Sequence, residues 1–125
     1  MDPKIEKERL TGDLIAATTV RGTEVYNRNG EHLGSIEDIM LHRYSDRIAY
    51  AVMAFGGFLG IGDKVHPVPW SMLDYDEDKG GYVVDISEEV LRDAPAYARD
   101  EIGDSDHGWR ERVFMHYGMV PYWNV

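Results

Sequence analysis

The sequence predicts a mainly β protein, in which five or six short strands are joined by tight turns and followed by short helices. Three observations carry this prediction. Runs of β-branched and aromatic residues recur between residues 18 and 86, an Asn-Gly pair separates two of these runs, and the clearest helix signals come after residue 86. Such a pattern favours a small β-barrel or a β-sandwich with helices appended at the C-terminus.

The 125 residues suffice for one ordinary domain, and the 43% of apolar residues can supply its core. We divide the chain into three segments. Residues 1–13 are mostly charged and are predicted to form a mobile arm or a short helix. Residues 14–90 form the barrel domain, and residues 91–125 form a helical and aromatic extension that packs on the barrel.

The first part of the predicted sheet is a hairpin. Thr18–Val20 and Thr23–Tyr26 carry residues that pack well on pleated surfaces. Asn29-Gly30 is a strong hairpin-turn signal, since both residues tolerate a positive φ. A second strand is expected over Glu31–Arg43, with a β-bulge near Asp38–Ile39, where the apolar alternation slips.

The middle of the sheet is predicted to be buried on both sides. Residues Ile48–Phe55 are apolar on both pleat faces, which is typical of a strand covered on each side. The glycine-rich segment Gly56–Gly62 is read as a loop. Asp63–Trp70 looks extended, and Pro67 and Pro69 place it at a sheet edge or a barrel corner, because proline cannot donate a ladder hydrogen bond.

The last part of the chain changes from strand to helix. Asp74–Gly81 is predicted to be an acidic turn and Tyr82–Ile86 a closing strand. Ser87 can cap a short helix. Residues 99–108 are expected to be a polar loop, and Trp109–Tyr117 has the spacing of a one-sided helix. The predicted core includes Val25, Ile39, Val52, Val68, Val84 and Ile86.

Residues 20–86 resemble the PRC-barrel family, the small β-barrel of the photosynthetic reaction-centre H subunit and of a ribosome-maturation factor. Gly22–Tyr26 leads into Asn29–Asp38, Ile48–Phe55 runs into Gly56–Lys64, and Val68–Leu73 follows. The segment Leu91–Tyr97 is similar to that of free-standing bacterial members. The resemblance implies a small PRC-type β-barrel that docks on proteins, with no catalytic residue shared across the family.

Charge and composition exclude several classes of function. The net charge of −10 and the lack of a basic stripe argue against nucleic acid as a partner. We see neither a secretory signal nor the ~20 consecutive apolar residues of a membrane span, so we expect a cytoplasmic protein without membrane insertion. The chain has no cysteine, which excludes disulfides and thiolate metal sites.

No catalytic, cofactor-binding or metal-binding residue is predicted. The five histidines lack the spacing that pairs metal ligands. Asp74, Asp76, Asp78 and Asp85 match four positions of a calcium-loop template, but Lys79 stands where that template needs glycine. The serines lack a nucleophile-elbow motif, and we therefore predict that the protein is not an enzyme.

Apolar side chains in two segments are the candidate interface residues. The glycine-rich loop carries three of them, and the aromatic tail either completes the core or contacts a partner. The candidates are Phe58, Leu59, Ile61, Trp109, Tyr122 and Trp123. The leading hypothesis is a non-catalytic interaction module that forms a homodimer and docks on an unidentified protein partner. The alternative is a small-ligand or ion-binding protein that uses the barrel mouth or the acidic turn at residues 74–85.

Overall fold

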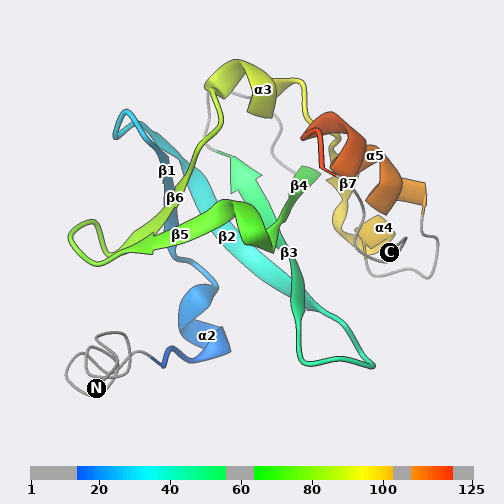
Figure 1. Ribbon diagram of the computed structural model, residues 1–125, viewed down its shortest axis with the longest axis horizontal. Helices are drawn as coiled ribbons and strands as arrows, with labels where there is room; N and C mark the ends of the chain where they lie inside the picture. The colour runs from blue at the N-terminus through cyan, green and yellow to red at the C-terminus, as the bar shows by residue number, and fades with distance from the viewer. Residues whose placement is uncertain (1–13, 56–63, 103–107, 120–125) are drawn as a thin grey trace.

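The computed structural model describes residues 14–55, 64–102 and 108–119 (Figure 1). Its strands are β1 (Glu24–Asn27), β2 (His32–Leu41), β3 (Ile48–Phe55), β4 (Lys64–Pro69), β5 (Leu73–Asp76), β6 (Gly81–Val84) and β7 (Tyr97–Ala98). Its helices are α2 (Ala17–Val20), the 3-10 turn η2 (Trp70–Met72), α3 (Glu88–Arg92), α4 (Arg99–Ile102) and α5 (Gly108–His116).

The seven strands form one sheet in the order β5-β6-β1-β2-β3-β4-β7. Neighbours are antiparallel except β1 and β6, which run parallel. The sheet curls around one apolar cluster, because buried side chains from β1 through β6 meet there. That cluster contains Val25, Leu33, Ile36, Ala51, Met53, Val68, Leu73, Tyr82 and Val84, together with Val20 and Leu91. The predicted barrel is thereby confirmed.

Two short helices cover opposite ends of the barrel (Figure 1). Helix α2 contributes Val20 and helix α3 contributes Leu91, and both side chains are buried in the barrel cluster. The Ser87 hydroxyl accepts a hydrogen bond from the Val90 amide, so α3 begins with the predicted serine cap. The barrel is therefore filled with side chains between these two covered ends.

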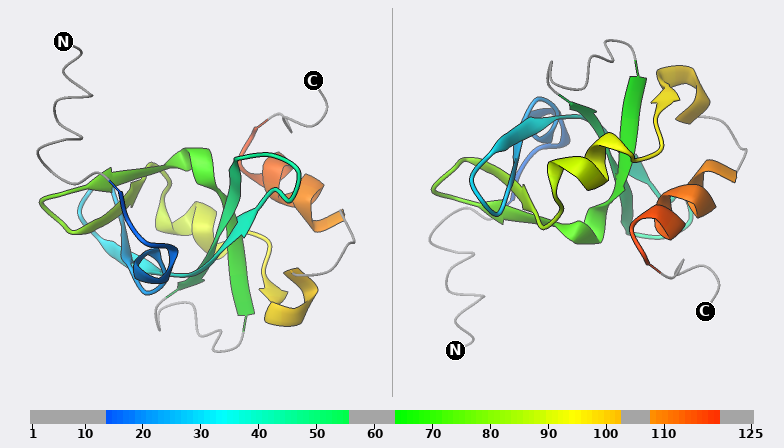
Figure 2. Two further views of the ribbon diagram at one scale, coloured as in Figure 1. Left: turned by 90° about the horizontal axis from the view of Figure 1, so that it is seen from below. Right: turned by 90° about the horizontal axis from the view of Figure 1, so that it is seen from above.

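Strand β3 is buried on both faces, as its sequence predicts. Ala51 and Met53 point into the barrel, while Tyr50 and Val52 lie in a second cluster outside it. The C-terminal segment supplies the rest of the outer cluster, and α4 and α5 lie together on this side of the sheet in both views of Figure 2. The outer cluster contains Tyr50, Val52, Val65, Tyr97, Ile102, Trp109, Val113 and Phe114.

The turn between β1 and β2 is built around a buried asparagine. The Asn27 side-chain oxygen accepts hydrogen bonds from the amides of Asn29 and Glu31, each at 3.0 Å. Its side-chain nitrogen donates to the Glu31 carboxylate. Gly30 follows with a φ of 83°, which glycine adopts at little cost. The Asn29-Gly30 pair therefore marks the hairpin correctly, but the buried Asn27 supplies its hydrogen bonds.

The predicted bulge lies in β2 at Glu37. Ile36 pairs with Met53 and Asp38 pairs with Val52, so Glu37 has no partner of its own across the sheet. Earlier in the same strand, the β2 and β3 backbones approach closely at Gly34. A Cβ at this position would stand 2.2 Å from the Ala54 carbonyl oxygen, so only glycine fits.

The two prolines of β4 lie where one side of the strand has no partner among the described residues. Strand β7 pairs only with Lys64 and Val65, whereas Pro67 and Pro69 pair with β3 alone. This arrangement agrees with the edge position that the prolines predict.

Asp74–Asp76, predicted as part of an acidic turn, belong to strand β5, which pairs with β6. Two predictions that concern helices are also wrong. Residues Thr18–Val20 form the helical turn α2 rather than a strand, because that turn brings Val20 into the barrel cluster. Residues 99–102 form α4 rather than a polar loop, where the Glu101 carboxylate accepts a hydrogen bond from the Ala98 amide and Ile102 is buried. In both cases burial against a distant element overrides a weak local preference.

Four of the six predicted core residues are buried, namely Val25, Val52, Val68 and Val84. Val52 belongs to the outer cluster rather than to the barrel interior. Ile39 and Ile86 are only partly buried and pack against the barrel cluster from its margin. Most of the predicted core is therefore confirmed. The sequence did not distinguish the barrel interior from the outer cluster, to which Val52 belongs.

Two leucines of β2 provide a matched test of the barrel core. Leu33 is buried in the barrel cluster, whereas Leu41 is 65% exposed. We expect Leu33→Ala to lower the free energy of unfolding by about 2–5 kcal/mol, because it removes buried methyl groups and leaves a cavity. Leu41→Ala should change it by no more than about 0.5 kcal/mol. Urea unfolding measures both, and equal losses would contradict the assigned core.

Candidate interaction surface

A groove of about 370 Å³ lies between the start of β3, the turn η2 and the end of α5. The antiparallel pairing of Tyr50 with Pro69 places the beginning of β3 beside the end of β4 and its following turn. The apolar residues of the lining are Ile48, Ala49, Pro69, Trp70, Phe114 and Met119. Arg47 and Ser71 are the polar residues of the lining. The groove is therefore an apolar depression with a cation in its lining.

Helix α5 supplies its side of the groove through Phe114 and Met119. The Phe114 ring packs edge-on against Tyr50, with ring centroids 5.6 Å apart. The helix ends at His116, and Gly118 just beyond it has a φ of 68°. The Met119 amide then donates a hydrogen bond to the Phe114 carbonyl at 2.9 Å, so the chain turns back toward the groove.

Basic side chains gather where the β2–β3 hairpin meets α5. The pKa of His42 is lowered mainly by burial, and the guanidinium groups of Arg110 and Arg47 lower it further. Burial raises the pKa of Tyr50 to about 12, while the positive charge of Arg110 nearby opposes that shift. Both effects place Arg110 beside the hairpin, on the same side as Arg47. This corner is cationic in a chain whose net charge is −10.

Large apolar side chains are exposed on the two elements that flank the groove. Tyr44 and Leu41, on the hairpin, are 93% and 65% exposed, and Met115, on α5, is 77% exposed. Single exposed apolar residues are ordinary on a protein surface. Here three of them occur on the hairpin and helix that also supply the groove, which makes this the strongest candidate interaction surface among the described residues.

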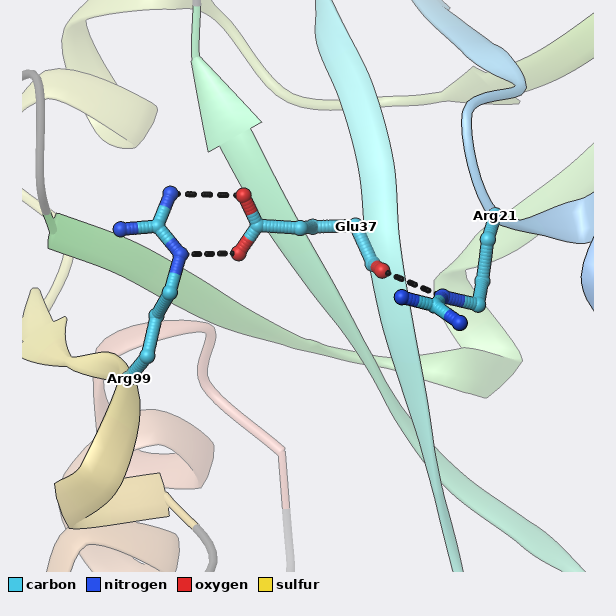
Figure 3. Close-up of polar contacts among 3 residues, drawn as sticks. All are labelled: Arg21, Glu37 and Arg99. Carbon is cyan, nitrogen blue, oxygen red and sulfur yellow. Dashed lines mark hydrogen bonds and ion pairs between the residues drawn. The ribbon is translucent and has the colours of Figure 1, made fainter.

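A carboxylate at the β2 bulge joins three distant parts of the chain (Figure 3). Both carboxylate oxygens of Glu37 accept hydrogen bonds from Arg99 at 2.6 Å, across 62 residues. The Glu37 carbonyl also accepts a hydrogen bond from the Arg21 side chain at 3.2 Å. Because a bulge turns its extra residue out of the ladder, Glu37 can hold α4 from one side and the α2–β1 connection from the other.

The structure places only one of the predicted interface residues. Trp109 is 5% exposed and packs in the outer cluster, with its ring 5.0 Å from Tyr50 and 6.2 Å from Tyr97. Its side chain thus lies between the sheet and α5, where it contributes to the packing of the chain itself. The other candidates, Phe58, Leu59, Ile61, Tyr122 and Trp123, lie outside the described residues.

The acidic segment at residues 74–85 is a hairpin of β5 and β6, and residues 77–80 form its turn. The Asp76 carboxylate accepts hydrogen bonds from the amides of Asp78 and Lys79, which shapes the turn. Arg28 lies 3.8 Å from the carboxylate of Asp74 and 3.4 Å from that of Asp85. Within residues 14–55, 64–102 and 108–119, no group of three or more potential ligands is close enough to hold a metal ion.

His66 in β4 is a fully buried ionisable side chain, at 1% exposure. It packs on Phe55 with ring centroids 4.4 Å apart, and neither ring nitrogen has a hydrogen-bond partner in the part of the chain that the structure describes. Burial lowers the pKa of His66 to about 4, and the backbone of Pro95 and Ala94 opposes the shift only in part. His66 is therefore neutral near pH 7 and belongs to the packing of β4.

Sequence reasoning missed the groove and the Glu37 contact. The signals for the groove were weak: Arg43, Tyr44 and Arg47 lie in a hairpin of an otherwise acidic chain. No sequence pattern links Glu37 to Arg99, because their contact depends on how the C-terminal segment folds back on the sheet.

The comparisons with known proteins agree with this geometry. A model of the PRC-barrel domain family matches residues 12–91, more than half of the chain, and the protein belongs to that family. The chain is also similar to an uncharacterized protein of Deinococcus radiodurans, with 25% identity over 85 residues. The matched region covers 68% of this chain and 30% of that relative, so the chain spans about a third of the length of the relative.

None of the helices among the described residues is long and apolar enough to cross a membrane.

The Glu37 contact should hold α4 on the barrel. We expect Glu37→Gln to lower the free energy of unfolding by about 1 kcal/mol or less, because the pair is partly exposed to solvent. Hydrogen exchange in α4 should become faster while exchange in α3 stays unchanged. Glu88→Gln is the matched control, since Glu88 pairs with Arg92 at 3.9 Å within a single helix. Unchanged exchange in α4 would contradict the assigned role.

The buried His66 should make stability depend on pH. Its pKa is about 4 in the folded protein and ~6.5 in an unfolded chain, so only the unfolded state binds the proton between these values. Stability should therefore fall as the pH falls from ~6.5 to ~4, by on the order of 2–3 kcal/mol. Denaturant unfolding of wild type and His66→Gln across this window measures the effect. Identical pH slopes in the two proteins would rule it out.

Proposed function

We propose that this protein is a non-catalytic interaction module that forms a homodimer and docks on a larger protein assembly. The observation that carries the proposal is the distribution of apolar side chains. The barrel interior is filled and its two ends are covered by Val20 and Leu91. Among the described residues, large apolar side chains that remain exposed, such as Leu41, Tyr44 and Met115, lie outside the barrel, which supports binding through its outer surface.

The absence of a catalytic role is supported by how the polar side chains are used. Asn27 and Asp76 shape turns, Ser87 caps a helix, and Glu37 and Arg99 pair with each other. These are structural tasks. Membership of the PRC-barrel domain family supports the same proposal, because the family resemblance implies docking on proteins and no shared catalytic residue.

The proposed dimer contact is the segment between β3 and β4. It carries Phe58, Leu59 and Ile61 among four glycines. Ordering such a segment costs roughly 1–2 kcal/mol of entropy per residue. A partner surface would offset that cost at roughly 25 cal/mol for each Å² of apolar area buried. A closed two-fold dimer is the commonest way to cover such a patch, and Tyr122 and Trp123 are proposed to lie near it.

Light scattering tests the dimer. Wild type should show twice the 14.3 kDa mass of one chain at two protein concentrations. Phe58→Asp combined with Leu59→Asp should yield a folded monomer, because the new carboxylates would be buried without partners. Leu14→Asp with Ile15→Asp is the matched control, since both of these residues are exposed, and this variant should remain a dimer.

The results separate the dimer from the loop. A wild-type monomer at all concentrations would refute the dimer. A dimer that survives the loop substitutions would show that another surface forms the contact.

A further inference from the structure

We propose that the groove between β3, η2 and α5 binds an acidic segment of a partner protein. One large apolar side chain of that segment would lie against Trp70 and Phe114, while neighbouring carboxylates would pair with Arg47 and Arg110. This inference rests on the proposed function as an interaction module, and it names the surface and the chemistry of the partner.

The size and lining of the groove fit an anchoring side chain. Its volume of about 370 Å³ stands at the lower end of the ~300–1,000 Å³ typical of ligand pockets. Two aromatic residues, Trp70 and Phe114, come from different elements and face the same depression. Protein interfaces concentrate their binding energy where one apolar side chain fills such a pocket, since its area leaves water completely.

The charges around the groove favour a partner segment with a negative charge. Arg47 lines the groove, and the electrostatic effects on His42 and Tyr50 place Arg110 beside the same hairpin. Within the hairpin, Arg43 and Arg47 outnumber the single carboxylate of Asp46. Guanidinium groups match carboxylates in a two-pronged geometry, so an acidic segment is complementary to this corner.

The overall charge argues for a short acidic segment over a nucleic acid. The chain has a net charge of −10, so the cationic corner is a local exception. Duplex DNA carries one charge per ~1.7 Å and would meet the acidic surface beyond the corner. Charges farther away than ~8 Å are screened at physiological salt, which lets a short segment respond mainly to Arg47 and its neighbours.

Fluorescence anisotropy on the full chain tests the proposal. The probe is a short fluorescein-labelled peptide that carries one leucine and one tryptophan between runs of aspartate. Wild type should bind it saturably, and binding should weaken as salt is added. The same peptide with asparagine in place of each aspartate should bind at least about tenfold more weakly, because it cannot pair with the arginines.

Three variants locate the site. Arg47→Glu should weaken binding of the probe at least about tenfold, and Ser71→Trp should do the same by filling the groove from an exposed position. Arg28→Glu is the matched control, with the same charge change at the other end of β2. It should alter binding by less than about twofold. In nuclear magnetic resonance spectra, the indole signal of Trp70 should shift on addition of the probe.

Several outcomes would overturn the proposal. One is a wild type that fails to bind the probe saturably, and another is equal weakening of probe binding by Arg47→Glu and Arg28→Glu. Tighter binding of a single-stranded thymidine oligonucleotide than of the probe would also contradict the proposal. Light scattering of Arg47→Glu tests whether a second copy of the chain occupies the groove. A change in mass relative to wild type would identify that copy as the occupant and would refute binding of a partner segment. A wild-type monomer that binds the probe as expected would refute only the dimer, whereas a dimer that ignores the probe would refute only the groove.

Discussion

Burial of β3 on both faces is the constraint on which the rest of the structure depends. Its inward side chains complete the barrel, and its outward side chains Tyr50 and Val52 must be covered by something outside the barrel. A curled sheet of this size cannot cover its own outer face, so the C-terminal segment does so with α4 and α5. Leaving such an apolar strip in water would cost roughly 25 cal/mol for each Å².

The candidate interaction surface is a consequence of that covering. Helix α5 lies across β3 and β4 and ends near the beginning of β3, where Phe114 and Met119 meet Ile48 and Trp70 without filling the space between them. The groove is therefore the margin of the outer cluster. The binding proposed for this margin fits the general division of a small domain, in which packed elements supply rigidity and their edges and connections supply binding.

Polar contacts also secure the covering segment. Glu37 pairs with Arg99 at the start of α4, and Arg112 donates a hydrogen bond to the Tyr97 hydroxyl at 3.0 Å. Each contact is partly exposed, so its contribution to stability is modest next to that of the outer cluster. Their main effect is on position, because a two-pronged arginine–carboxylate pair restricts both distance and orientation.

The sequence by itself determined the features that depend on neighbouring residues: the Asn29-Gly30 turn, the bulge in β2, the serine cap of α3, and the two-sided burial of β3. It could not assign Val20 or residues 99–102 to helices, since burial against distant elements decided their conformation. The groove and the Glu37–Arg99 pair were likewise decided only by the tertiary structure. A residue pattern reports which face of an element is apolar, but it does not report which distant segment covers that face or which charges the covering brings together.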